Sequence, residues 1–173
     1  KPRDVADYSF RKMAADMLGL MRALGHERFA LAGHDRGARV THRLALDAPQ
    51  AISRACVMDI VPTHTLLSQL RKEVAASYYH WFFLAQPAPF PEAMIGHDPD
   101  RYYESCLLGW GGASLADFDA GQLAAYRAAW HDAEVTRGMC NDYRAALTHD
   151  FEDDARDLGA RLECPTLVLY GAD

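Results

Sequence analysis

The five residues Gly33-His34-Asp35-Arg36-Gly37, written GHDRG, place a carboxylate between two glycines and directly before an arginine. They follow the apolar run RFALA and precede ARVTHRLALDAP, whose apolar spacing is helical, so a strand-to-helix turn is predicted. Glycine on both sides of Asp35 allows the tight turn of a nucleophile elbow, which exposes one side chain above a sheet. A carboxylate there can displace a leaving group from an sp³ carbon and form an ester that water then cleaves. These five residues fit equally well an aspartate that caps the following helix.

The segments around this turn alternate between helix and strand. Apolar residues at helical spacing follow Ser9, a candidate N-cap, and end at Gly25, and a strand is expected at residues 29–32. After the turn, the helix should end before Pro49, and ACVMDI should form a buried strand ending near Ile60. This order of helices and strands is typical of a parallel sheet with crossover helices.

A different pattern occupies residues 62–163, where helical pieces rich in aromatic residues are interrupted by proline and glycine. The sheet pattern returns in CPTLVLYGAD, with a strand expected at 166–170. We therefore expect an α/β fold in which residues 1–61 form the central core with the elbow, residues 62–163 a helical cap, and residues 164–173 a returning core strand. Within the cap, the acidic run DFEDDARD is expected to be a solvated helix face rather than a metal site.

Composition narrows the classes of partner. The chain has 173 residues, a formal net charge of −6 and 50% hydrophobic residues, which disfavours nucleic acid and anionic membranes as partners. No apolar segment approaches the ~18 residues of a membrane span, and the four cysteines lack metal-binding spacing. These features predict a cytoplasmic protein with a small-molecule partner and without a metal.

Four segments carry a resemblance to a known family. In order along the chain they are GHDRGARVTHRLALDAP, MDIVPTHTLL, YYHWFFLAQPAPFPE and CNDYRAA. Together they resemble the haloacetate (fluoroacetate) dehalogenases of the alpha/beta-hydrolase fold. The resemblance implies a hydrolase without a cofactor that converts fluoroacetate or chloroacetate to glycolate and halide through an aspartyl ester. Its partner would be a small 2-haloacid, and a homodimer of the parent chain is compatible with it.

The resemblance also implies roles for residues of the turn. Asp35 would be the nucleophile, and Arg36 and Arg39 would bind the substrate carboxylate, since a guanidinium fork binds two oxygens at once. Helical spacing puts Arg39 on nearly the same face as Arg36. Without the family pattern, a surface salt bridge would be the simpler interpretation of Arg39.

The halide pocket, by the same resemblance, would be formed by His80, Trp81 and Tyr143. Their ring N–H and O–H groups are donors that can stabilise a leaving fluoride. The segment SYYHWFFL fits equally an aromatic stripe in the core of a cap helix.

Hydrolysis of the ester further requires a histidine that activates water. The resemblance implies that Asp59, at the end of the second strand, orients this histidine, and Asp173 is the alternative acid. No histidine of the chain matches the family's base motif, and we expect the base after residue 173. Two or three parallel strands leave a sheet open, so upstream core strands are also expected outside the chain. Residues 1–173 alone are therefore expected to be inactive.

Two other functions stay open. An epoxide hydrolase shares the aspartate nucleophile and uses cap tyrosines to protonate the epoxide, for which Tyr143 and one of Tyr78, Tyr79, Tyr102 or Tyr103 would serve. Arg36 argues against it, because an uncharged epoxide needs no carboxylate clamp. A protein of another class, which binds a small carboxylate without catalysis, would keep the pocket and lack the histidine.

Overall fold

The computed structural model describes residues 1–109 and 112–171, and the chain divides into two compact units. We call Asp4–Ser77 with Ala145–Asp173 the sheet unit, and Lys1–Arg3 with Tyr78–Arg144 the helical unit. The sequence predicts a cap at residues 62–163, whereas the main segment of the helical unit runs from Tyr78 to Arg144. Residues 62–77 and 145–163, which flank that segment in the sequence, belong to the sheet unit. As a division by function, core and cap stay a prediction.

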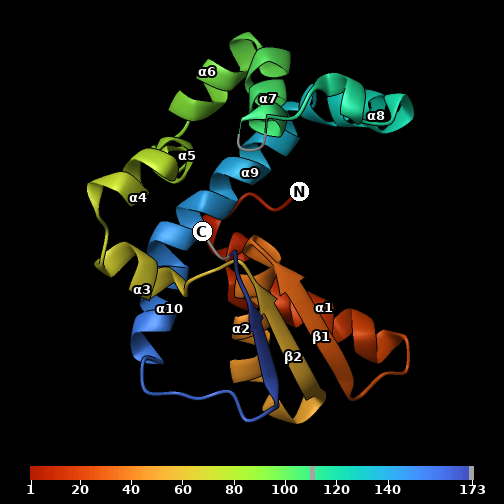
Figure 1. Cartoon of the computed structure of the whole chain (residues 1–173), viewed down its shortest axis with the longest axis vertical. Helices are drawn as coiled ribbons and strands as arrows, with labels where there is room; N and C mark the ends of the chain where they lie inside the picture. The colour runs from red at the N-terminus through yellow and green to blue at the C-terminus, as the bar shows by residue number, and fades with distance from the viewer. Residues whose placement is uncertain (110–111, 172–173) are drawn as a thin grey trace. The chain divides into compact units, whose positions relative to one another are not determined.

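The sheet unit contains eight described helical segments and three strands. Its helical segments are η1 (Val5–Tyr8), α1 (Phe10–Ala23), α2 (Arg36–Asp47), η2 (Pro49–Ala51), α3 (Thr63–Ser68), α4 (Lys72–Ser77), the π-helix η4 (Ala146–Asp150) and α10 (Phe151–Arg156). Its strands are β1 (Phe29–His34), β2 (Ile52–Met58) and β3 (Thr166–Leu169). All three are parallel and lie side by side in the order β1-β2-β3 (Figure 1). The predicted α/β fold is confirmed.

The local signals in the sequence account for the first elements. The Ser9 hydroxyl accepts a hydrogen bond from the Lys12 amide and caps α1, and Gly25 follows the helix at φ 84°. The strand β1 continues to His34, beyond the predicted end at residue 32, because the ladder with β2 runs on to Met58.

The core of the sheet unit lies between the helices and the sheet. Helix α2 packs on β1 and β2, and α1 packs on α2. Leu44 of α2 and Ile52 of β2 are each 1% exposed, and Ala14 of α1 lies in the same cluster. The strand β3 contributes little to this core, since all four of its residues are exposed.

The acidic run at residues 150–157 departs from expectation. Asp150 and Asp153 are buried, so the prediction of a solvated face is wrong for these two residues. The Asp150 carboxylate accepts a hydrogen bond from the Phe10 amide at 2.7 Å, and Asp153 pairs with Arg11 at 3.0 Å and with Arg156. The physical reason is that these carboxylates face the start of α1, where an amide and a guanidinium replace their hydration.

The helical unit has a small core of its own. Its helical segments are α5 (Tyr79–Leu84), α6 (Phe90–His97), α7 (Pro99–Leu108), η3 (Leu115–Asp117), α8 (Ala120–Trp130) and α9 (Ala133–Ala145). Leu84, Ile95 and Cys140 form the buried cluster, and Arg144 pairs with Glu92 at 2.6 Å. Among the described residues, no helix is long and apolar enough to span a membrane.

Candidate active site

Asp35 occupies the turn between β1 and α2. Its backbone has φ 50° and ψ −123°, a region that disfavours side chains with a Cβ atom. Its amide donates to the Met58 carbonyl at 3.2 Å, and its own carbonyl accepts from the Ala38 amide at 3.0 Å to begin α2. The side chain is exposed and makes no capping hydrogen bond with the helix. Asp35 therefore occupies the N-cap position of α2 without capping the helix through its carboxylate, and its role in a nucleophile elbow stays a prediction.

The two glycines that flank Asp35 differ in what they contribute. A Cβ atom on Gly33 would lie well inside 3.0 Å of the Gly37 carbonyl oxygen and of the Thr41 hydroxyl. Gly33 thus lets the first turns of α2 approach the end of β1. A Cβ atom on Gly37 would meet no atom within 4 Å, and the positive φ falls on Asp35 itself. Close approach at Gly33 is therefore the structural reason for glycine in this motif.

Asp59, directly after the neighbouring strand, shares one feature of this backbone geometry, a positive φ. It follows β2, is exposed, and has φ 56°. Its amide donates to the Leu169 carbonyl of β3 at 2.8 Å. The structure thus puts both predicted acids at the carboxyl edge of one parallel sheet, where open α/β sheets carry functional groups. Asp173, the alternative acid, lies outside the described residues.

Arg39 lies in the second turn of α2 and is 3% exposed. Its Nη1 donates to the Val61 carbonyl at 2.6 Å and to the Thr63 hydroxyl at 3.1 Å. It is therefore not the surface salt bridge that the simpler interpretation of the sequence favoured. These two bonds connect the start of α2 to the segment directly after Asp59.

Arg36 is the first residue of α2 and is half-buried. Its guanidinium carbon lies 5.0 Å from the centre of the Phe10 ring, above its face. Such an arrangement is a cation–π contact. Both predicted carboxylate-binding arginines are thus held in place by other residues of the sheet unit, each in a different way.

The three residues predicted to bind halide contact one another within the helical unit. The Tyr143 ring lies 5.7 Å from the His80 ring and 5.6 Å from the Trp81 ring, edge to face in both cases. Trp81 is 2% exposed, whereas His80 and Tyr143 are half-buried. Residues 63 positions apart in sequence therefore form one cluster of ring donors, and their role in halide binding stays a prediction.

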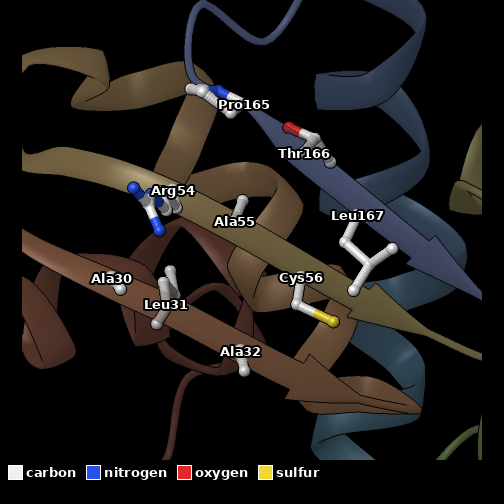
Figure 2. A pocket seen from close by; sticks show the side chains of 9 residues that line it. All are labelled: Ala30, Leu31, Ala32, Arg54, Ala55, Cys56, Pro165, Thr166 and Leu167. Carbon is white, nitrogen blue, oxygen red and sulfur yellow. The ribbon is translucent and has the colours of Figure 1, made fainter.

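A groove of about 480 Å³ lies on the surface of the sheet. Its lining comes from residues 30–32 of β1, 54–56 of β2 and 165–167 around β3, and Figure 2 shows that small and apolar side chains dominate it. Arg54 is its charged residue. None of the predicted site residues that the structure describes lines this groove. The groove therefore belongs to the face of the sheet and not to the candidate site.

Comparison with known proteins places the chain in a family. The sequence pattern of the alpha/beta hydrolase fold matches residues 1–173, the whole chain. The chain belongs to this family. This alpha/beta hydrolase chain is 52% identical over 169 residues to a fluoroacetate dehalogenase from Burkholderia sp., covering 98% of the chain and 56% of that relative.

Solved structures agree on the fold of this alpha/beta hydrolase. A proposed epoxide hydrolase from Pseudomonas aeruginosa matches with a TM-score of 0.91 and 42% identity, over 99% of this chain and 58% of the other. A proposed alpha/beta hydrolase from Nostoc sp. PCC 7120 matches with a TM-score of 0.90 and 44% identity, over 97% and 57%. The hydrolase chain described here spans a little more than half the length of these relatives.

Sequence reasoning did not find two residues that hold the site arginines. Thr63 lies in MDIVPTHTLL. It becomes a hydrogen-bond partner of Arg39 only through the path of the chain after β2, which no periodicity in the sequence predicts. Phe10 directly follows the helix cap Ser9 and has the spacing of an ordinary core residue. Its contact with Arg36 joins two helices and appears only in the folded chain.

Proposed function

We propose that the protein containing this chain hydrolyses the carbon–halogen bond of small 2-haloacids, with fluoroacetate and chloroacetate as its substrates. The observation that carries the proposal is the exposed carboxylate of Asp35 on a strained turn, without a capping bond and with two arginines in the next four residues. The similarity to a fluoroacetate dehalogenase supports the same reaction.

The first step is a displacement at the carbon next to the carboxylate. One Asp35 oxygen attacks this carbon, the new C–O bond forms as the carbon–halogen bond breaks, and the halide leaves with the bonding pair. The product of this step is an ester of Asp35 with glycolate. A turn that keeps the carboxylate clear of the helix amides favours the attack, because a capped carboxylate would first have to break its hydrogen bonds.

Substrate binding falls to Arg36 and Arg39 in the proposed mechanism. Arg36 and Arg39 lie among the first four residues of α2, directly after Asp35, and their guanidinium groups would bind the substrate carboxylate and orient its halogen-bearing carbon. They also offset repulsion between the two carboxylates, substrate and nucleophile, that must approach each other.

The leaving halide would be bound by His80, Trp81 and Tyr143. Each carries an N–H or O–H group that can donate to an anion, and the mutual ring contacts hold the three residues as a group. Donors that strengthen as charge develops on fluoride lower the barrier for its departure.

Water completes the reaction by attacking the ester carbonyl, which returns Asp35 and releases glycolate. A base must take a proton from this water, and we propose that Asp59 orients the histidine expected after residue 173. The positive φ of Asp59, on the strand next to Asp35, supports this role.

The test is halide release by the full-length protein from fluoroacetate and from chloroacetate, with Asp35→Asn as the matched variant. We expect release by the wild type and none by the variant, together with a carboxymethyl adduct on Asp35 trapped by rapid acid quenching and seen by mass spectrometry. Release that continues unchanged in Asp35→Asn would exclude this nucleophile.

Epoxide hydrolysis is the second candidate, because a proposed epoxide hydrolase is among the similar structures. It requires a tyrosine that donates a proton to the epoxide oxygen. Burial raises the pKa of Tyr102 well above its usual value, which makes Tyr102 a weaker acid, and the Tyr103 hydroxyl shares a hydrogen bond with Thr136. Diol formation from an uncharged epoxide, with no halide release from haloacetates, would favour this function. Binding of acetate without either activity would instead favour the non-catalytic carboxylate-binding protein.

A further inference from the structure

The contact between Arg36 and Phe10 involves a site arginine, and the proposed reaction does not itself explain it. Phe10 begins α1, 26 positions before Arg36 in the sequence, and its side chain is 3% exposed. The Arg36 guanidinium carbon stands 5.0 Å from the ring centre. The Phe10 ring is buried whereas Arg36 is half-buried, so the ring is the more constrained partner of the contact.

The backbone that carries the ring is fixed from two sides. The Phe10 amide donates to the buried carboxylate of Asp150 at 2.7 Å, which ties the first turn of α1 to η4. The preceding residue, Ser9, caps the same helix by accepting from the Lys12 amide. The backbone of Phe10 is thus set by residues that lie more than a hundred positions apart, and its side chain is buried.

The form of the contact suits a substrate-binding arginine. An aromatic ring attracts a guanidinium through its π face and takes no N–H donor in a conventional hydrogen bond. A carboxylate, in contrast, binds a guanidinium through its N–H donors. The Phe10 ring can therefore hold the guanidinium of Arg36 without replacing a carboxylate as its acceptor.

We propose that Phe10 is a positioning residue, which holds the guanidinium of Arg36 in the place where it binds the substrate carboxylate. This inference rests on the proposed function, in that it assigns carboxylate binding to Arg36. Phe10 acts only through Arg36 and does not touch the substrate. Its loss should weaken binding of carboxylates and leave the displacement step at Asp35 comparatively unaffected.

A double-mutant cycle in the full-length protein tests the proposal, with acetate as the probe and calorimetry as the binding measurement. We expect Phe10→Leu to raise the acetate dissociation constant roughly 3- to 10-fold, the range of a partly desolvated cation–π contact. Phe10→Tyr, which keeps the ring, should restore most of the affinity. In an Arg36→Gln background, Phe10→Leu should have no further effect, since its partner is already gone.

Two controls separate positioning from general loss of structure. Ile52→Val shortens a fully buried side chain at the start of β2, the opposite end of the strand from Asp59, and should leave acetate binding unchanged. With chloroacetate as substrate, Phe10→Leu should raise KM while kcat changes by less than KM, the pattern of lost ground-state binding.

The outcomes distinguish this inference from the proposed function. An unchanged acetate affinity in Phe10→Leu, or a loss that persists in the Arg36→Gln background, overturns the positioning role. A wild type that binds acetate but releases no halide overturns dehalogenation, and the cycle still decides the role of Phe10. A wild type that neither binds acetate nor releases halide overturns both.

Discussion

Asp35 directly follows His34 of β1, and Asp59 directly follows Met58 of β2. His34 and Met58 pair with each other in the register of the two strands. The Asp35 amide closes this edge by donating to the Met58 carbonyl at 3.2 Å. Both aspartates have a positive φ, 50° and 56°, which costs a non-glycine residue of order 1–3 kcal/mol. Among the non-glycine residues that the structure describes, these two aspartates are the ones with a positive φ, and they lie at the same edge of the sheet.

Relief of this strain should stabilise the protein at the expense of its activity. We expect Asp35→Gly to raise the free energy of unfolding by about 1 kcal/mol, because glycine adopts a positive φ without a Cβ clash. Halide release should disappear in the same variant. Urea unfolding of the two proteins measures the first effect, and Asp35→Asn, which keeps the Cβ atom, is the matched control that should show no gain. A less stable Asp35→Gly protein would mean that the turn is not strained.

The glycines of the elbow should respond to alanine in opposite ways. Gly33→Ala places a Cβ atom inside 3.0 Å of the Gly37 carbonyl and the Thr41 hydroxyl, and we expect a loss of about 3 kcal/mol. Gly37→Ala meets no atom within 4 Å and lies inside α2, so it should be neutral or more stable by up to about 1 kcal/mol. Thermal unfolding of the two variants side by side provides the check. Equal losses would contradict the close approach at Gly33.

Thr63 should contribute to stability through its hydrogen bond with Arg39. The side chain is 1% exposed, and its hydroxyl accepts from the guanidinium at 3.1 Å. Thr63→Val keeps the shape but removes the acceptor, and hydrogen bonds to charged groups contribute about 1.5–3 kcal/mol. We expect a loss of about 2 kcal/mol in chemical denaturation. Thr65→Val, in the same helix and only half-buried, serves as the control and should change stability far less.

His42 should make the protein less stable in mild acid. Burial in α2 lowers the pKa of His42, an effect that Arg43 and Arg39 reinforce and that Asp154 and Asp157 oppose. The unfolded chain therefore binds the proton more readily than the folded one. Stability is fully present above the ordinary pKa of about 6.5 and decreases as the pH falls through the lowered value.

The measurement for His42 is the free energy of unfolding at several pH values between about 7.5 and 5. His42→Gln cannot take up the proton, so its stability should fall less steeply over this interval than that of the wild type. Identical slopes in the two proteins would show that His42 is not the group responsible.

Much of the fold could be predicted from the sequence because its signals are local. The cap at Ser9, the stop at Gly25 and the apolar runs before Asp35 and Asp59 each depend on a few neighbouring residues. The acidic run was predicted as solvated because charge alone was considered. Its burial depends on Arg11 and on the Phe10 amide, which come from a distant helix.

The candidate site shows the same limit. Asp35 could be proposed from its glycine-flanked turn, but only the folded chain reveals that Gly33 is the glycine packed closely and that the helix leaves the carboxylate uncapped. The supports of the arginines, Phe10 and Thr63, carry no motif. They are contacts between elements, and a pattern along one chain segment does not contain them.

The exposure of β3 bears on how the chain behaves at high concentration. In the part that the structure describes, β3 is an edge strand whose residues Leu167, Val168 and Leu169 are about half exposed, and Tyr170 follows at 80%. The run PTLVLY has no charge and a high tendency to form strands. An apolar edge of this kind offers its unpaired backbone groups to a second strand, the first step of ordered aggregation. When residues 1–173 are prepared alone, residues 166–170 are accordingly where we expect them to associate first, and a lysine in place of Val168 should raise the concentration at which they remain monodisperse.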